Sequence, residues 1–279
     1  MDYQILVDSC GDFSEKMKLS DNIVPIALKI QIDGEELTDD ETLDISVFME
    51  KLEHSVNCPH SSCPSPAQYI EGYDKAAERI YIVTGSSSLT GSYNSACLAR
   101  DMLKEENAKA QICVVDSKTA SAGQALLVMK IIEWEESRLD FLGIRQKITE
   151  YRKQIKTRFV LENLKMLEKS GRLSGLKAKV AQALHILPVL EATPEGTIGQ
   201  SGQARGIKKA MSVLMKQIVA DCGNRMPDRL VISQCGCPER ALDLKNKLQE
   251  KYPDLEILIL PTKGISSMYA GSGGIVVAY

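Results

Sequence analysis

Hydroxyl and acidic side chains stand at the ends of several predicted strands of this 279-residue chain. In an open parallel sheet the loops at the carboxyl ends of the strands converge on one crevice, so we expect these side chains to lie near one another. A serine-rich turn that leads into a helix offers hydroxyl groups, backbone N–H groups and the positive end of the helix dipole together. Such a set suits a small anion, either a carboxylate or a phosphate. The segments are Asp8-Ser9, Ser61-Ser62, Ser86-Ser87-Ser88 and Asp116-Ser117.

Helix capping is the competing explanation for serines at these positions. Ser65 is followed by Pro66 and Gln68, which is the pattern of a capping box, and we interpret Ser65 as a helix cap. For Ser86 and Ser87 both explanations stay open, because three consecutive serines exceed what one cap requires.

Two arginines stand beside a glycine and near a predicted helix. Arg172 follows Gly171, and Arg205 precedes Gly206. A glycine neighbour leaves a guanidinium room to reach a phosphate or a partner protein. A single loop arginine is more often solvated, so a functional and a structural interpretation both stay open here.

The composition argues against some classes of protein. The chain has 34 Lys and Arg against 37 Asp and Glu, a formal charge of −3, whereas a protein that binds nucleic acid through phosphate contacts is expected to be basic. No apolar run reaches the roughly 18 residues that span a bilayer. The first residues also lack the basic and apolar segments of a secretory signal. We therefore expect a soluble, cytoplasmic protein.

The sequence lacks the familiar signatures of nucleotide-binding and hydrolytic enzymes, with no G-x-x-x-x-G-K-[ST], G-x-G-x-x-G, G-x-S-x-G or H-E-x-x-H. None of the three histidines stands beside a plausible catalytic nucleophile, and His185, in an apolar segment, is interpreted as structural. The eight cysteines show no Cys-x-x-Cys spacing, so we expect neither a metal site nor a disulfide framework. Cys235 and Cys237 form the only close pair, and we interpret both as buried or loop thiols.

Strands and helices alternate along the first half of the chain, which implies parallel pairing with right-handed crossovers. We therefore predict a doubly wound α/β domain over residues 1–155. Residues 23–32 have the spacing of a strand and end at Asp33-Gly34, which predicts a hairpin turn. The other predicted strands are 5–7, 80–83 and 112–115, and the predicted helices are 45–52, 66–79, 93–106, 122–136 and 139–155.

The second half predicts a mixed α/β or α+β domain over residues 156–279. Pro194-Glu195-Gly196 is good hairpin-turn chemistry between two extended segments. The predicted strands are 159–160, 187–193, 197–199, 230–233, 257–260 and 275–279, and the predicted helices are 161–169, 176–186, 207–220 and 240–251.

Taken in order, these segments resemble the DegV family of bacterial fatty-acid-binding proteins over nearly the whole chain. Residues 86–96 follow the family pattern Ser-Ser-x-Leu-Ser-Gly-Thr-Tyr-x-Ser-Ala closely, and residues 61–65 are similar to Thr-Ser-Gln-Pro-Ser. Each match is weak by itself, but their order and spacing together are specific. The other matching segments are residues 5–9, 115–117, 171–174, Pro188 and residues 205–210.

The resemblance implies a fold of two α/β domains with a long-chain fatty acid buried in an apolar tunnel between or within them. It also implies that the fatty-acid carboxylate is held by Ser61 or Ser62 together with Ser86 or Ser87. The chain would then be a lipid-binding protein rather than an enzyme. Its ligand would be the bound acid, with no cofactor and no metal.

The resemblance further implies a protein partner. In FakB-type members of the family, the acid is presented to a separate ATP-dependent fatty acid kinase subunit. That subunit makes an acyl phosphate for phospholipid synthesis. Arg172 and Arg205 would lie near the carboxylate exit or at the kinase interface.

The chain departs from the family near its C-terminus. The usual Gly-x-His-x-Gly-Pro-Gly stands here as residues 267–273, with Tyr269 for the histidine and Ser272 for the proline. A tyrosine donates one hydrogen bond but carries no positive charge at neutral pH. The departure therefore bears on phosphoryl transfer more than on lipid binding. Ser61 stands where threonine is usual, which keeps the hydroxyl.

Two other hypotheses compete with a lipid carrier. In the first, the chain is a kinase-like or transferase subunit whose serine loops bind a small phosphorylated substrate. That class needs a nucleotide loop or paired metal-binding carboxylates, and the sequence offers neither. In the second, the serines are caps and the arginines are solvated, which predicts a filled crevice between the domains.

Overall fold

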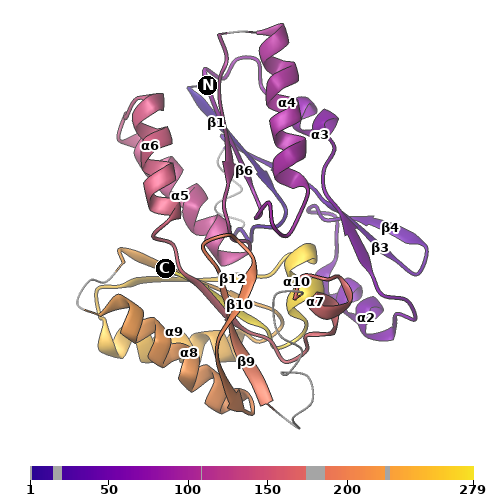
Figure 1. The fold of residues 1–279 in the computed structure, drawn as a ribbon, viewed down its shortest axis with the longest axis vertical. Helices are drawn as coiled ribbons and strands as arrows, with labels where there is room; N and C mark the ends of the chain where they lie inside the picture. Colours follow the sequence, from indigo (N-terminus) through magenta and orange to yellow (C-terminus); the bar gives the residue numbers. More distant parts are fainter. Residues whose placement is uncertain (1, 15–20, 108, 174–185, 224–226) are drawn as a thin grey trace.

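The computed structural model describes residues 2–14, 21–107, 109–173, 186–223 and 227–279. In these residues the strands form three sheets with helices between and around them (Figure 1). One large sheet contains strands that precede residue 117, and the other contains strands that follow residue 156. A smaller sheet is inserted into the first half of the chain.

The first sheet consists of β1 (Tyr3–Asp8), β2 (Ile23–Ile26), β6 (Arg79–Thr84) and β7 (Gln111–Asp116), and its helices are α3 (Pro66–Glu71), α4 (Ser92–Glu106), α5 (Ala122–Glu136) and α6 (Phe141–Arg152). All its strands are parallel, in the order β2-β1-β6-β7. Successive side chains of a strand point to opposite faces. Leu6 packs with α3 and α4, whereas Ile5 and Val7 pack with α5 and α6. This confirms the predicted doubly wound α/β arrangement.

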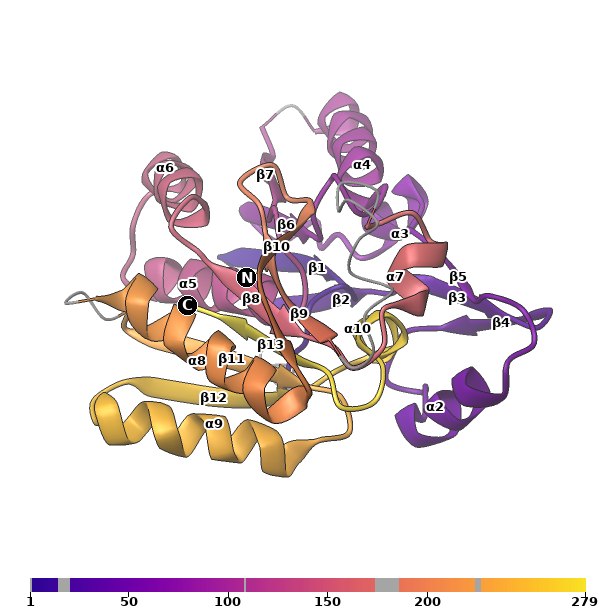
Figure 2. The ribbon, with the colours of Figure 1, turned by 60° about the horizontal axis from the view of Figure 1, so that its bottom comes forward.

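The small antiparallel sheet carries Ser61 and lies beside the first sheet (Figure 2). It consists of β3 (Lys29–Ile32), β4 (Glu35–Thr38) and β5 (His60–Ser62), with α2 (Ile45–His54) nearby. The predicted strand 23–32 is therefore divided between two sheets, because β2 pairs with β1 and β3 pairs with β4. The hairpin turn lies where it is predicted, with φ values of 47° at Asp33 and 87° at Gly34.

The second large sheet has the strand order β10-β9-β8-β13-β11-β12. These strands are β8 (Thr157–Val160), β9 (Ile186–Ala192), β10 (Ile198–Arg205), β11 (Arg229–Gln234), β12 (Glu256–Pro261) and β13 (Ile275–Ala278), and the helices are α7 (Lys165–Lys169), α8 (Ile207–Cys222), α9 (Pro238–Lys251) and α10 (Gly264–Ala270). Only β11 and β12 pair in parallel; the other described pairs are antiparallel. Residues of α8 and α9 pack together on one face of this sheet. The second half is therefore mixed, as predicted.

Helix α5 lies between the two large sheets (Figure 1). It contacts β6 on one side and β11 and β13 on the other. Leu126, Leu127, Val128 and Ile131 are all fully buried, which explains why apolar residues occur on more than one side of this helix. One core thus joins the two halves of the chain, and the division into domains 1–155 and 156–279 stays a prediction.

Some predicted helices differ in extent from the observed ones. The helix predicted over 66–79 has the predicted Ser65 capping box but ends at Glu71, before Gly72. Of the helix predicted over 161–169, only the part Lys165–Lys169, which is α7, is helical. Helix α10 lies where the sequence pattern predicts no helix. The predicted helix 176–186 lies outside the described residues apart from its last residue, which begins β9, and His185 lies outside them as well.

Candidate functional site

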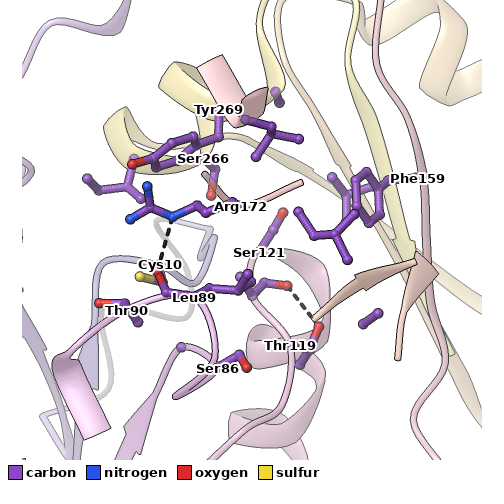
Figure 3. Close-up of a pocket in the computed structure, with 18 of the residues that line it drawn as sticks. Cys10, Ser86, Leu89, Thr90, Thr119, Ser121, Phe159, Arg172, Ser266 and Tyr269 are labelled. Carbon is purple, nitrogen blue, oxygen red and sulfur yellow. Dashed lines mark hydrogen bonds between the residues drawn. The ribbon is translucent and has the colours of Figure 1, made fainter. Parts of the chain in front are cut away.

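A largely apolar cavity lies where the three sheets meet (Figure 3). Its volume is about 130 Å³, whereas protein interiors usually leave few voids larger than one water molecule. Its walls are the loops after β1, β6 and β7, the strands β8, β9, β10 and β13, and α10. The apolar residues in these walls include Leu28, Leu89, Phe159, Leu161, Ile265 and Val276.

One end of the cavity is polar and contains Tyr269, Arg172 and Ser61 (Figure 3 labels the first two). The hydroxyl oxygens of Ser61 and Tyr269 are hydrogen-bonded at 2.8 Å. The Arg172 guanidinium stacks on the Tyr269 ring, 4.5 Å from its centroid. Its Nε donates to the carbonyl oxygen of Leu89 at 3.0 Å. Within the described residues, the structure records no hydrogen bond or ion pair from Nη1 or Nη2 of Arg172, so these donors are available to an anion.

Tyr269 is neutral at physiological pH. Burial raises the pKa of its hydroxyl above the ordinary value of 10.0, although the hydrogen bond with Ser61 acts in the opposite direction. The positive charge at this end of the cavity therefore comes from Arg172. A guanidinium together with two hydroxyls can bind a singly charged, planar anion such as a carboxylate.

Asp39 holds the N-terminus of α10, the helix that carries Tyr269. Its Oδ1 accepts from the Gly264 N–H at 2.8 Å, and its Oδ2 accepts from the Ile265 N–H at 2.9 Å. A Cβ on Gly264 would lie 2.6 Å from Oδ1, so glycine is what permits this approach. An isolated helix of seven residues is marginal in water. The position of Tyr269 therefore depends on contacts such as these.

Asp39 also makes the stability of the protein depend on pH. It is 3% exposed, and burial raises its pKa from 3.8 to about 6. Since the folded state binds this proton more tightly than the unfolded state, the stabilisation is complete below about pH 4 and is lost as the pH rises through 6. We expect the unfolding free energy of the wild type, minus that of Asp39→Asn, to fall by about 2.4 kcal/mol from pH 4 to pH 7. Urea denaturation at a series of pH values measures the unfolding free energies of the wild type and of Asp39→Asn. If the two free energies changed with pH in parallel, the raised pKa of Asp39 would be contradicted.

The Asp8-Ser9 turn positions a neighbouring loop. Asp8 is fully buried, and both of its carboxylate oxygens accept from the Gly85 N–H, at 3.1 and 2.9 Å. Gln124 Nε2 donates to Asp8 Oδ1 at 2.7 Å. The Ser9 hydroxyl accepts from the Leu28 N–H at 3.0 Å. Both side chains of this motif are therefore committed to holding the loop after β6 and the strand end near Leu28.

The predicted carboxylate-binding serines of the loop after β6 are both engaged with the protein. Ser86 lines the cavity, but its hydroxyl donates to the carbonyl oxygen of Gly196 at 2.7 Å. Ser87 is not among the lining residues. Its hydroxyl accepts from Lys118 Nζ at 3.0 Å, and its N–H donates to Asp116 Oδ1 at 3.0 Å. A carboxylate role for either serine stays a prediction.

Ser62 and Arg205 do not belong to the cavity lining. Ser62 is exposed at the end of β5, whereas the adjacent Ser61 lines the cavity. Arg205 is exposed at the end of β10, and Ile198 at the other end of that strand lines the cavity. Six residues of strand lie between the two, a distance of roughly 23 Å. Of the predicted site residues, the structure brings Ser61, Ser86, Arg172 and Tyr269 to one cavity.

Several hydroxyl residues of the cavity were not predicted. Thr90 lies within residues 86–96, which follow the family pattern, and Figure 3 places it near Arg172. Thr119 follows the Asp116-Ser117 turn, and its Oγ1 lies 2.8 Å from Oγ1 of Thr157. Ser121 and Ser266 also line the cavity. The motifs on which the prediction rests lie within a few residues of Thr90, Thr119 and Ser121, but no local signal marks Thr157.

The described part of the chain contains no cluster of three His, Cys, Asp or Glu side chains that could hold a metal ion. All eight cysteines lie in that part, and all are free thiols. Cys235 is buried, and the Cys237 thiol lies 3.5 Å from the carbonyl oxygen of Gly274. None of the described helices is both long enough and apolar enough to cross a lipid bilayer.

Comparison with known proteins identifies the family. The family model that describes uncharacterised proteins of the DegV family matches residues 2–279. This chain belongs to the DegV family. A DegV domain-containing protein of Streptococcus gordonii is 34% identical over 281 residues, which cover 100% of this chain and 99% of the relative.

Solved structures of DegV proteins share the fold. A DegV-family protein from Ruminococcus gnavus, refined with vaccenic acid, is 41% identical, with a TM-score of 0.95 and 99% of each chain covered. The fatty acid kinase (Fak) B3 protein of Streptococcus pneumoniae, loaded with linoleic acid, is 32% identical, with a TM-score of 0.92 over 100% of this chain and 99% of the other. The expected DegV fold, with its α/β first half and mixed second half, is thus confirmed.

Proposed function

We propose that this DegV protein binds a long-chain fatty acid in the cavity, with the alkyl chain along the apolar walls and the carboxylate at the Ser61–Tyr269–Arg172 end. The observation that carries the proposal is an apolar cavity whose one polar end holds hydroxyls and a guanidinium whose Nη1 and Nη2 no described residue uses. The hydroxyls of Ser86 and Thr90 line the same cavity. The cavity would widen into a tunnel as the chain enters.

The energetics favour such a ligand. Each buried methylene contributes about 0.8 kcal/mol, so a chain of sixteen carbons contributes about 12 kcal/mol before the costs of ordering. A buried carboxylate is costly unless it is hydrogen-bonded and paired with a charge. Arg172 supplies the charge, and the hydrogen-bonded pair of Ser61 and Tyr269 supplies one hydroxyl proton, since the other lies between their two oxygens. The cavity therefore offers apolar walls to the alkyl chain of a fatty acid and hydrogen-bond donors to its carboxylate.

The ligands of related proteins support the same proposal. The R. gnavus protein was refined with vaccenic acid, and the S. pneumoniae protein was loaded with linoleic acid. A DegV protein from Eubacterium eligens, 27% identical, was loaded with heptadecanoic acid. All three ligands are single-chain acids. They differ in unsaturation and length, so the shared feature is the carboxylate on a long alkyl chain.

Native mass spectrometry of the purified protein tests the proposal. We expect a bound species of 250–300 Da, on the order of one long-chain fatty acid, in a 1:1 complex. Delipidated protein should take up hexadecanoic acid in the same ratio. Protein that carries no lipid and takes up none on addition would contradict the proposal. Binding of ATP in calorimetry by delipidated protein would instead favour a kinase-like or transferase subunit.

We further propose that the bound acid is presented to a separate ATP-dependent fatty acid kinase subunit, which phosphorylates the carboxylate. The similarity to a fatty acid kinase (Fak) B3 protein supports this role. Arg172 and Tyr269 would lie at the exit of the carboxylate, and the exposed Arg205 would contact the kinase. Acyl phosphate should form only when kinase, ATP and lipid-loaded protein are all present. Equal formation without this protein would contradict the presenting role.

A further inference from the structure

A hairpin tip from the second half of the chain is attached to the serine loop of the first half. The tip consists of residues 193–197, between β9 and β10. The Ser86 hydroxyl donates to the Gly196 carbonyl oxygen at 2.7 Å, and the Ser88 hydroxyl donates to the Glu195 carbonyl oxygen at 2.7 Å. Two adjacent carbonyls of the tip are thus held by two serines of one loop.

The tip fits closely against the first half of the chain. Gly196 has a φ of 80°, and a Cβ there would lie 2.2 Å from Ser86 Oγ and 3.1 Å from Cα of Lys118. Lys118 itself has a φ of 57°, a conformation that non-glycine residues adopt uncommonly. Strained backbone tends to persist where the surrounding structure fixes it for a purpose. The contact is therefore a specific docking of two loops.

The position of the tip sets the position of a cavity wall. Ala192, Thr197 and Ile198 flank or belong to the tip, and all three line the cavity. If the tip moved away from the serine loop, this wall would move with it. The hydrogen bonds of Ser86 and Ser88 therefore act on the space that surrounds the alkyl chain.

The bonding of Ser86 also argues against a role in binding the headgroup. A hydroxyl has one proton to donate, and Ser86 donates it to Gly196. Its oxygen accepts from the Ser88 N–H at 3.2 Å. A carboxylate needs donors, and Arg172 has donors that no described residue uses.

We infer that Ser86 and Ser88 are positioning residues that hold the hairpin tip closed over the alkyl part of the ligand. This inference rests on the proposed function, since it assigns a role in retaining the same lipid. The serine-rich motif would then control how long the chain is kept, while Ser61, Tyr269 and Arg172 recognise the acid.

Release rates of an acid and an alcohol with the same chain separate the two roles of Ser86. Radiolabelled hexadecanoic acid and hexadecanol are loaded on the protein, and their transfer to phosphatidylcholine vesicles is followed. We expect the double variant Ser86→Ala/Ser88→Ala to release both ligands about tenfold faster, the effect of losing two neutral hydrogen bonds. Faster release of the acid alone would overturn the inference, because it would make Ser86 a headgroup ligand. Unchanged release of both would overturn it too.

The variant Ser137→Ala is the matched control. The Ser137 hydroxyl also donates to a backbone carbonyl, that of Glu133 at 2.7 Å, but it lies at the end of α5 and does not line the cavity. We expect its release rates to equal those of the wild type. If Ser137→Ala accelerated release as much as the double variant does, the hairpin tip would not be the cause.

Cleavage after Glu195 by a glutamyl endopeptidase tests the tip without any lipid. In delipidated protein we expect faster cleavage at this bond in the double variant than in the wild type, because the tip leaves its docked position more often. Equal cleavage rates would overturn the inference even if lipid binds. Failure of the wild type to bind acid or alcohol would instead contradict the proposed function, and the cleavage result would still decide whether the serines hold the tip.

Discussion

Replacement of Ala192 by phenylalanine is expected to abolish the binding of long-chain fatty acids. Ala192 ends β9, and its side chain lines the cavity. The added ring would occupy space in a cavity of only about 130 Å³, which already has to widen to admit the alkyl chain. An aromatic residue is favourable in a strand. We expect affinity for hexadecanoic acid to fall by at least a hundredfold, on the order of 3 kcal/mol or four lost methylene contacts.

The stability of Ala192→Phe distinguishes a filled cavity from a damaged fold. A side chain that fills an existing void should leave the unfolding free energy within about 1 kcal/mol of the wild type. Ala67→Phe serves as the control, because Ala67 is exposed on α3 and does not line the cavity. Calorimetric titration with hexadecanoic acid and urea denaturation measure the two quantities. Normal lipid affinity in Ala192→Phe would place the alkyl chain elsewhere.

Substitution of Arg172 by methionine should selectively weaken the binding of the acid. Methionine keeps an unbranched side chain beside the Tyr269 ring but removes the guanidinium that stacks 4.5 Å from it. Hydrogen bonds to a charged partner contribute about 1.5–3 kcal/mol each. We therefore expect the affinity for hexadecanoic acid to fall by about tenfold to a hundredfold. The affinity for hexadecanol, which carries no charge, should change little.

A second arginine that also stacks on a ring provides the control for Arg172→Met. Arg145 lies 5.8 Å from the centroid of Phe141 on α6 and does not line the cavity. Arg145→Met should bind both ligands as the wild type does. If Arg172→Met weakened acid and alcohol equally, Arg172 would contribute packing rather than charge recognition. Competition with a fluorescent fatty acid at fixed ionic strength measures all four affinities.

Local sequence patterns predicted most of the elements because their causes are local. The capping box at Ser65 and the Asp33-Gly34 turn are both present, since they depend on residues within one or two turns of chain. The helix predicted over 122–136 has the same bounds as α5. The sequence pattern does not predict helix α10, because the helix has only seven residues. Its first backbone N–H groups donate to the Asp39 carboxylate, which is 225 residues away from Gly264 in the sequence.

The sequence predicted only some residues of the candidate site, and there is a physical reason why it missed the others. The family resemblance predicts a site made of Ser61 or Ser62 and Ser86 or Ser87, with Arg172, Arg205 and Tyr269 near it; of these residues, Ser61, Ser86, Arg172 and Tyr269 line one cavity. Sequence order could not say which hydroxyls are already bonded to the protein. Ser86 donates across 110 residues to Gly196, and such a long-range contact leaves no local trace. Arg205 was grouped with Arg172, yet a full strand separates it from the cavity.

The order of motifs along this chain was enough to predict its family, its parallel first sheet and a set of hydroxyl loops suited to an anion. The motifs depend on neighbouring residues, and the ends of parallel strands converge at one edge of a sheet. Only the tertiary structure decided which donors remain free. Arg172 stacks on Tyr269, and no described residue accepts a hydrogen bond from its Nη1 or Nη2. The Ser86 hydroxyl, in contrast, donates its proton to the hairpin tip. The reason is that each hydroxyl has a single proton, and long-range packing alone selects the acceptor that receives it.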